Sequence, residues 1–233
     1  MMRYRSIVLA ATLITSSHVA NAQDQMGEII VTAQRSSGEY YSDDQTVIGL
    51  RRQADSAVQR VSISSDSRDE TQRKREIHAM LLAAIDRAGS AGVQLVTGEF
   101  ELVPVTRDNY RDILFEVGNR PDTSRIDLMV KAKLSESVGT AQKRIHDFIR
   151  AVPPDGRALM ERNGSLTLTI VNPDQYRDEI AKLVAAEAKR YASYFGSDYG
   201  VEVGGLSEQL YWSQVSNTEV FLYIPYRFSV RPR

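Results

Sequence analysis

The chain has 233 residues, of which 42% are hydrophobic, and carries 29 Lys and Arg against 30 Asp and Glu, with no cysteine. The lack of cysteine excludes disulfides, thiol nucleophiles and cysteine-ligated metals. The nearly balanced charge lacks the basic excess typical of nucleic-acid-binding proteins, so we expect no nucleic-acid partner.

The first 22 residues contain the three parts of a secretory signal peptide in the expected order. Arg3 and Arg5 supply positive charge, residues 6–14 form an apolar run, and Ala20-Asn21-Ala22 matches the small-x-small pattern that signal peptidase cleaves. The run is too short to span a bilayer, which needs about 20 apolar residues, and no later stretch is apolar enough. We therefore expect cleavage after Ala22, a periplasmic or secreted mature protein, and no transmembrane span after cleavage.

Residues 23–53 are predicted to contain a short N-terminal strand followed by a polar linker. The linker includes Ser36-Ser37-Gly38 and Ser42-Asp43-Asp44, which have the composition of turns. The strand is rich in β-branched residues, which favour extended backbone. It consists of Glu28, Ile29, Ile30, Val31, Thr32 and Ala33.

Residues 54–135 are predicted to form a first α+β subdomain. Apolar and polar residues alternate over 57–64, which indicates a half-buried strand. Ser67 or Asp69 can cap the following helix, whose apolar residues recur at helical spacing until Gly89. Two extended runs then lead to a regularly alternating strand, and these three segments are predicted at 93–105, 113–117 and 125–134.

Residues 136–233 are predicted to form a second α+β subdomain. A short amphipathic helix at 138–149 ends at Pro153-Pro154, and an alternating strand follows at 165–171. Asn172-Pro173 is typical of a helix start, and the long helix it begins is expected to run to Phe195 and stop at Gly196. Its predicted apolar stripe contains Tyr176, Ile180, Leu183, Val184, Ala188, Tyr191 and Phe195.

Two β-rich runs close the chain, at 201–214 and 220–230, and Pro225 predicts a bulge or an edge in the second. Strand-rich pieces separated by lone helices favour an α+β fold over a doubly wound parallel sheet. We therefore expect antiparallel sheets, each covered by helices, in a two-part architecture.

Four features of the chain resemble the SIMPL-domain family of bacterial exported proteins. Ala54-Asp55-Ser56-Ala57 resembles the family's Pro-Asp-x-Ala segment before its first long strand, although Ala54 stands where proline is usual. The other three are a helix followed by Gly92, Pro104 and Tyr110, an alanine-rich helix ending at Gly196, and a terminal aromatic strand at 220–230. The resemblance covers residues 54–230 and implies a two-part α+β fold in an envelope-associated protein. The family has no established catalytic residues, so the resemblance implies none here.

Residues 28–35 also resemble the TonB box of outer-membrane receptors, which lies just after the signal peptide. A TonB box works by strand addition, in which an extended segment pairs with the sheet edge of a partner. The alternative is that this segment is the first strand of the SIMPL-like fold itself. Both interpretations stay open at the level of the sequence.

No residue pattern indicates catalysis or a bound metal. His78 and His146 are the only histidines after the signal peptide, and a metal site needs three or four ligands at defined spacing. No Gly-x-Ser-x-Gly segment or phosphate-binding loop is present. We expect no catalytic residues, no cofactor and no metal, and thus no enzyme; a hydrolase with an unrecognised site among scattered acids is an alternative.

Aromatic residues gather near the C-terminal end of the sequence. Tyr211, Trp212, Tyr223 and Tyr226 are candidates for a partner-binding surface, because tyrosine and tryptophan are favoured at interfaces. The alternative is core packing against Tyr191, Tyr194 and Phe195 of the long helix.

The leading hypothesis is a non-enzymatic exported protein of the bacterial envelope that acts by binding or assembly, with a homo-oligomer or an envelope protein as partner. The resemblance to the SIMPL-domain family implies envelope maintenance or stress protection. The alternative from another class is a periplasmic adaptor that engages TonB-type machinery through residues 28–35.

Overall fold

The computed structural model describes residues 27–31, 48–99, 101–118, 120–134 and 137–233. The predicted signal peptide, Thr32, Ala33 and residues 34–47 of the predicted linker lie outside these residues. The described chain combines helices with antiparallel sheets, which confirms the predicted α+β class.

Seven strands form the main sheet, which is antiparallel throughout. Its central strand β3 pairs with β7 over ten residues on one side and with β8 on the other. The order across the sheet is β1-β8-β3-β7-β4-β5, and β6 also pairs with β7. The strands are β1 Glu28–Val31, β3 Ser56–Ser65, β4 Gln94–Thr97, β5 Val103–Pro104, β6 Glu116–Val117, β7 Ser124–Lys133 and β8 Leu159–Val171.

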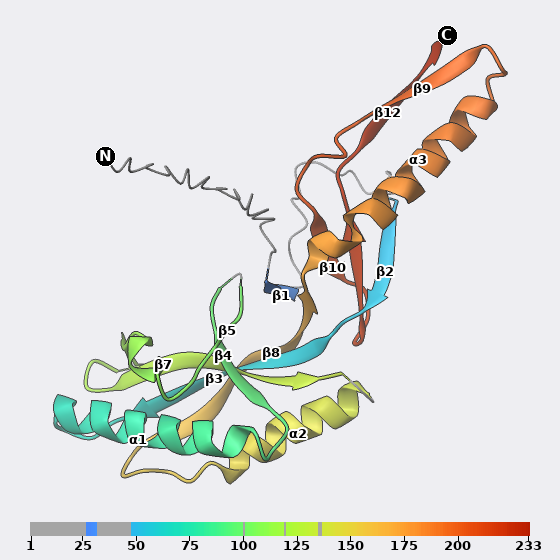
Figure 1. The fold of residues 1–233 in the computed structure, drawn as a ribbon. Helices are drawn as coiled ribbons and strands as arrows, with labels where there is room; N and C mark the ends of the chain where they lie inside the picture. Colours follow the sequence, from blue (N-terminus) through green and yellow to red (C-terminus); the bar gives the residue numbers. More distant parts are fainter. Residues whose placement is uncertain (1–26, 32–47, 100, 119, 135–136) are drawn as a thin grey trace, which may run out of the picture.

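Two helices, α1 Glu70–Ala88 and α2 Val138–Ala151, cover one face of this sheet (Figure 1). Strand alternation places Ile63 and Val130 on the covered face, where they share one core with Leu81 and Phe148 of the helices. Asp69 caps α1, since its carboxylate accepts a hydrogen bond from the Gln72 amide at 2.8 Å. Strands β3 and β7 and helices α1 and α2 lie within two residues of their predicted ranges. The predicted run at 93–105 forms only β4 and β5, the run at 113–117 forms only β6, and β8 begins six residues before its predicted start at 165.

The main sheet curls so that its two end regions meet. Ile29 of β1 forms an isolated β-bridge with Glu101, and the Leu102 amide donates to the Glu28 carbonyl at 2.9 Å. The curl encloses a second, smaller apolar cluster on the face opposite the helices. Its members are Ile30, Val58, Val96, Leu102 and Met129.

An arm projects from this body (Figure 1) and consists of residues 48–53 and 172–233. A three-stranded sheet, β10-β11-β2, lies at its base, and the hairpin of β9 and β12 extends to its far end. Helix α3 packs on β2, β9 and β12. The elements are β2 Gly49–Gln53, the 3-10 turn η2 Pro173–Tyr176, α3 Arg177–Ser193, β9 Tyr199–Gly204, β10 Tyr211–Gln214, β11 Glu219–Tyr223 and β12 Arg227–Pro232.

The long helix differs from its prediction at both ends and on one face. Asn172 adopts a left-handed conformation, with φ of 42°, and makes no side-chain cap; a 3-10 turn follows, and α3 begins only at Arg177. The buried stripe is Ile180, Val184, Ala188 and Ala192. Leu183, Tyr191 and Phe195 are exposed, because α3 turns only one side toward the strands beneath it, β2, β9 and β12.

The two expected subdomains do not follow the boundary at residues 135/136. Strand β8 comes from the second predicted subdomain and yet pairs with β3 of the first, while β2 comes from the predicted linker and belongs to the arm. The run at 220–230 is also two strands rather than one bulged strand. Near Pro225, which has no amide hydrogen to donate, the chain passes from the sheet of β11 to the hairpin of β12.

Candidate functional site

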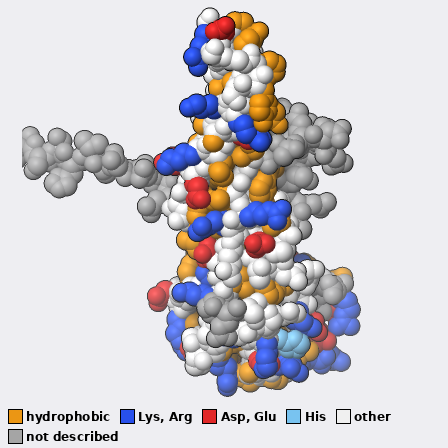
Figure 2. All heavy atoms as spheres, turned by 90° about the vertical axis from the view of Figure 1, so that its right-hand side faces the viewer, with side chains coloured by type: hydrophobic (Ala, Val, Ile, Leu, Met, Phe, Trp, Pro, Cys, Tyr) orange, Lys and Arg blue, Asp and Glu red, His pale blue; other side chains and the backbone are white. Residues whose placement is uncertain are grey.

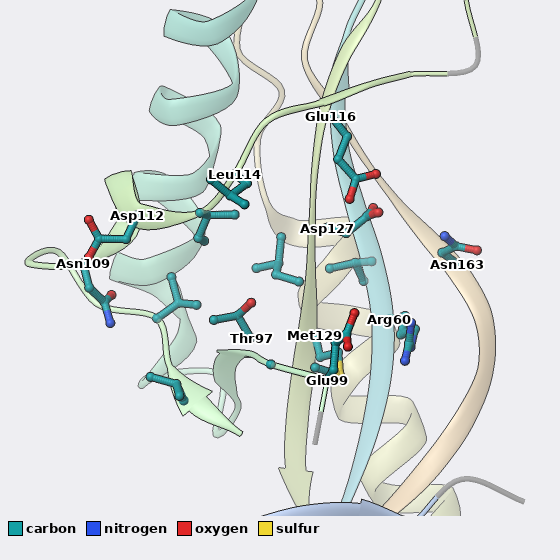
Figure 3. A pocket seen from close by; sticks show the side chains of 16 residues that line it. Arg60, Thr97, Glu99, Asn109, Asp112, Leu114, Glu116, Asp127, Met129 and Asn163 are labelled. Atoms are coloured by element: carbon teal, nitrogen blue, oxygen red, sulfur yellow. The ribbon is translucent and has the colours of Figure 1, made fainter. Parts of the chain in front are cut away.

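The open face of the main sheet carries a cavity of about 550 Å³ (Figure 3). Its polar lining comes from several strands: Arg60 from β3, Glu116 from β6, Asp127 from β7 and Asn163 from β8. Leu114, which is 83% exposed, adds an apolar wall. The cavity therefore offers mixed polar and apolar contacts in a wide, solvent-open setting.

The bulge between Gln59 and Arg60 shapes this face. The Gln59 side-chain amide is buried and donates to the carbonyls of Asn163 at 3.0 Å and Gly164 at 3.1 Å, which satisfies backbone groups that the broken register leaves unpaired. Arg60 and Asn163, which are register partners on β3 and β8, both line the cavity, as does Glu99 (Figure 3).

Two carboxylates of the cavity already share a cation. Glu116 accepts from Arg125 at 2.7 Å, and Asp127 lies 3.4 Å from the same guanidinium. The pKa of Arg125 is raised, first by the hydrogen bond that its guanidinium donates to Glu116 and then by the charge of Asp127. Asp127 Oδ1 is buried and has no hydrogen-bond partner among the described residues. The arrangement can bind a polar group, but Arg125 offsets the acidic charge.

The two histidines lie on different helices and are not brought together. His78 on α1 packs edge-on against the rings of Tyr110 and Phe115, with centroids 5.3 and 5.1 Å away. Burial, and then the charge of Arg111, lower the pKa of His78. Within the described parts of the chain, no three metal-binding side chains converge. No helix among them is long and apolar enough to cross a membrane.

Residues 28–31 of the predicted partner strand lie in the main sheet as β1. Their register with β8 runs from Glu28 opposite Val171 to Val31 opposite Leu168. Ile29 and Ile30 are buried on opposite faces, and the Glu28 carboxylate pairs with Lys131 and accepts from Thr169. This segment is therefore built into the body through backbone, apolar and charged contacts.

The four residues of the predicted aromatic surface lie at the base of the arm and differ in burial. Trp212 and Tyr223 are buried, whereas Tyr211 and Tyr226 are half-buried. The Tyr211 and Tyr223 rings stack with centroids 5.7 Å apart. Burial is the main cause that raises the pKa of Tyr226, opposed by a hydrogen bond with the backbone of Ile48. Tyr211, Trp212 and Tyr223 therefore lie in the sheet of β10 and β11, whereas Tyr226 stacks on Phe228 of β12, with ring centroids 6.4 Å apart.

A different aromatic group lies at the far end of the arm, and we call it the aromatic tip: Tyr191, Tyr194, Phe195 and Tyr199. Tyr194 is 65% exposed and Phe195 is 59% exposed. Tyr191 packs against Tyr194 and Phe228, and Phe195 packs against Tyr199. Hydrophobic side chains gather at this end of the arm in Figure 2, beside lysine and arginine side chains.

Local sequence explains why the aromatic tip stays outside the core. Gly196, with φ of +103°, lets the chain reverse between α3 and β9, so aromatics on both sides of the turn meet at the end of the arm. Sequence reasoning placed Tyr191, Tyr194 and Phe195 as core partners and did not single out Tyr199. The available signal was the density of four aromatics within residues 191–199, more than one helical stripe can bury.

Comparisons of this chain with protein-family models, with curated proteins and with solved structures give no match.

Proposed function

We propose that this is a non-enzymatic, exported protein of the bacterial envelope, related in kind to SIMPL-domain proteins, and that it acts by binding through its arm. The exposure of the aromatic tip carries this proposal. Large aromatic side chains gathered on an exposed end are unusual for a protein with no partner at that place.

The arm does not need the tip for its own core. Ile180, Val184 and Ala188 of α3 are fully buried, although the rings of Tyr194 and Phe195 on the same segment are exposed. Burying one such aromatic side chain contributes a free energy of about 1.5–3 kcal/mol. A partner that covered the tip would therefore gain binding free energy from surface that is exposed to water in the isolated protein.

The adaptor hypothesis for residues 28–35 is less well supported. Strand addition needs a segment whose backbone is free to pair with a partner. Residues 28–31 pair with β8, and Leu102 donates to Glu28 from the other side. Docking through this segment would first require β1 to leave the sheet and expose Ile29 and Ile30.

The open-face cavity gives weaker support for hydrolysis than the tip gives for binding. A carboxylate pair in a hydrolase needs one group to act as an acid and one as a base. Here Glu116 and Asp127 share Arg125, which is a structural pairing that charged surfaces commonly show.

Site-specific photo-crosslinking in cells that express the full chain tests the proposal. A photoreactive phenylalanine analogue replaces Tyr194 in one strain and Leu114, an exposed residue of the body, in the matched control. We expect an adduct from position 194 that is absent from position 114. No adduct at 194, or the same adduct from both positions, would contradict a role for the arm.

A further inference from the structure

We infer that the aromatic tip docks on the surface of an anionic lipid bilayer. This inference rests on the proposed function, because it names the class of partner that the arm binds. Two independent features of the arm support it, the chemistry of its exposed side chains and the sign of its charge.

The side chains of the tip suit the interfacial layer of a membrane. Tyrosine combines an apolar ring with a polar hydroxyl and is enriched where lipid headgroups meet acyl chains. Three of the four tip residues are tyrosines, and Phe195 adds a purely apolar ring. The 17 residues of α3 span about 25 Å, which carries the tip away from the body and lets it reach a surface first.

The far part of the arm is basic in a chain that is slightly acidic. Residues 185–204 and 226–233 contain five Lys and Arg against three Asp and Glu, a side-chain net charge of +2, whereas the whole chain has −1. Arg190 pairs with Glu187, and Arg231 pairs with Glu202. The remaining three bases have no carboxylate within 4.0 Å among the described residues: Lys189, Arg227 and Arg233.

This charge favours a bilayer over a second copy of the arm. A symmetric tip-to-tip contact would bring together two arm ends whose side chains each carry a net charge of +2, and like charges oppose association. An anionic bilayer supplies the opposite sign, and each lysine or arginine near it strengthens attraction until salt screens the field.

Vesicle flotation tests the inference with protein purified after export from cells that express the full chain. We expect binding to vesicles of phosphatidylglycerol and phosphatidylcholine, and little binding to phosphatidylcholine alone. The Y194S/F195S variant should partition roughly tenfold less, because it lacks the two most exposed rings. K189E should bind more weakly while keeping every aromatic residue. Salt at about 0.5 M shortens the Debye length to roughly 4 Å and should release the wild type.

V117S is the matched control, since Val117 of β6 is 70% exposed and lies on the body, and this variant should float like the wild type. Circular dichroism confirms that each variant is folded. Absence of flotation with anionic vesicles, or equal flotation of Y194S/F195S and the wild type, would overturn the inference. If sedimentation velocity instead shows self-association that Y194S/F195S abolishes, the arm binds a second copy, and the proposed function survives while the bilayer inference fails.

Discussion

At the scale of single residues, the least expected feature of the body is a buried carboxylate. Glu76 on α1 is 5% exposed and accepts hydrogen bonds from Ser65 at 2.6 Å, Ser67 at 2.9 Å and Gln72 at 2.9 Å. Burial is the largest influence on the pKa of Glu76 and would raise it, but the hydrogen bonds outweigh burial and hold the pKa below its ordinary value of 4.5.

Position 156, beside this network, has room only for glycine, because a Cβ atom there would lie 2.4 Å from Glu76 Oε1. The same glycine has φ of +54°, a left-handed conformation that glycine adopts without strain. The sequence indicated the turn after α2 only as the end of a helix. In the structure, this turn also leaves space for the Glu76 carboxylate.

Replacing Glu76 with glutamine should destabilise the protein at pH 7 by roughly 1–3 kcal/mol, because an amide cannot accept all of these hydrogen bonds. A lowered pKa in the folded state means that the carboxylate contributes stability above about pH 4.5 and loses it as the pH falls through the folded value. The difference between wild type and E76Q should therefore narrow in acid. Urea unfolding from pH 7 to pH 3 measures this, with the exposed E179Q as control; a difference that widens in acid would contradict it.

At the scale of elements, α3 shows which side of a helix stabilises the arm. Val184 is fully buried in the core, while the adjacent Leu183 is 39% exposed. The two residues have similar hydrophobicity and neighbouring positions, so the sequence alone assigned both to the buried stripe.

Val184→Asp should destabilise the protein by about 3 kcal/mol or more, because it places an unpaired charge in the core of the arm. Leu183→Asp should cost less than about 1 kcal/mol, since its carboxylate can reach water. Chemical unfolding followed by circular dichroism compares the two variants directly. Equal losses would show that α3 is rotated from the orientation described here.

Local periodicity was enough to predict β3, α1, β7 and α2, because each buries one regular face against the same core. It was not enough for β8, which was expected at 165–171 and begins at Leu159. Residues 159–164 have no apolar alternation, and they extend because β3 supplies hydrogen-bonding partners across a register shift. The exposure of the aromatic tip was not predicted for a related reason. It depends on which strands pack beneath the end of α3, and a local sequence pattern does not contain that information.

At the scale of the whole molecule, the chain crosses between body and arm where Asp55 lies. Its backbone amide donates to Thr169 at 2.9 Å, its carbonyl accepts from Leu134 at 3.1 Å, and its carboxylate accepts from Val171 at 2.7 Å. The neighbouring Ala54 amide donates to Thr218 of the arm at 2.8 Å. Ala54 and Asp55 thus join the two parts of the molecule, and the hydrogen bond to the Val171 amide gives a physical reason for an aspartate at position 55.

Both the proposed function and the bilayer inference need the protein to leave the cytoplasm, so export is the prediction on which they depend. Arg3 and Arg5, the apolar run at 6–14 and the Ala20-Asn21-Ala22 segment lead us to expect a mature N-terminus at or near Gln23. Intact-mass spectrometry of protein from the periplasmic fraction measures this directly. The matched A20L/A22L variant should keep its first 22 residues and stay with the inner membrane, because leucine is too large for the cleavage site. Wild-type protein that retains Met1 and remains in the cytoplasm would contradict export, and with it any contact between the arm and the envelope.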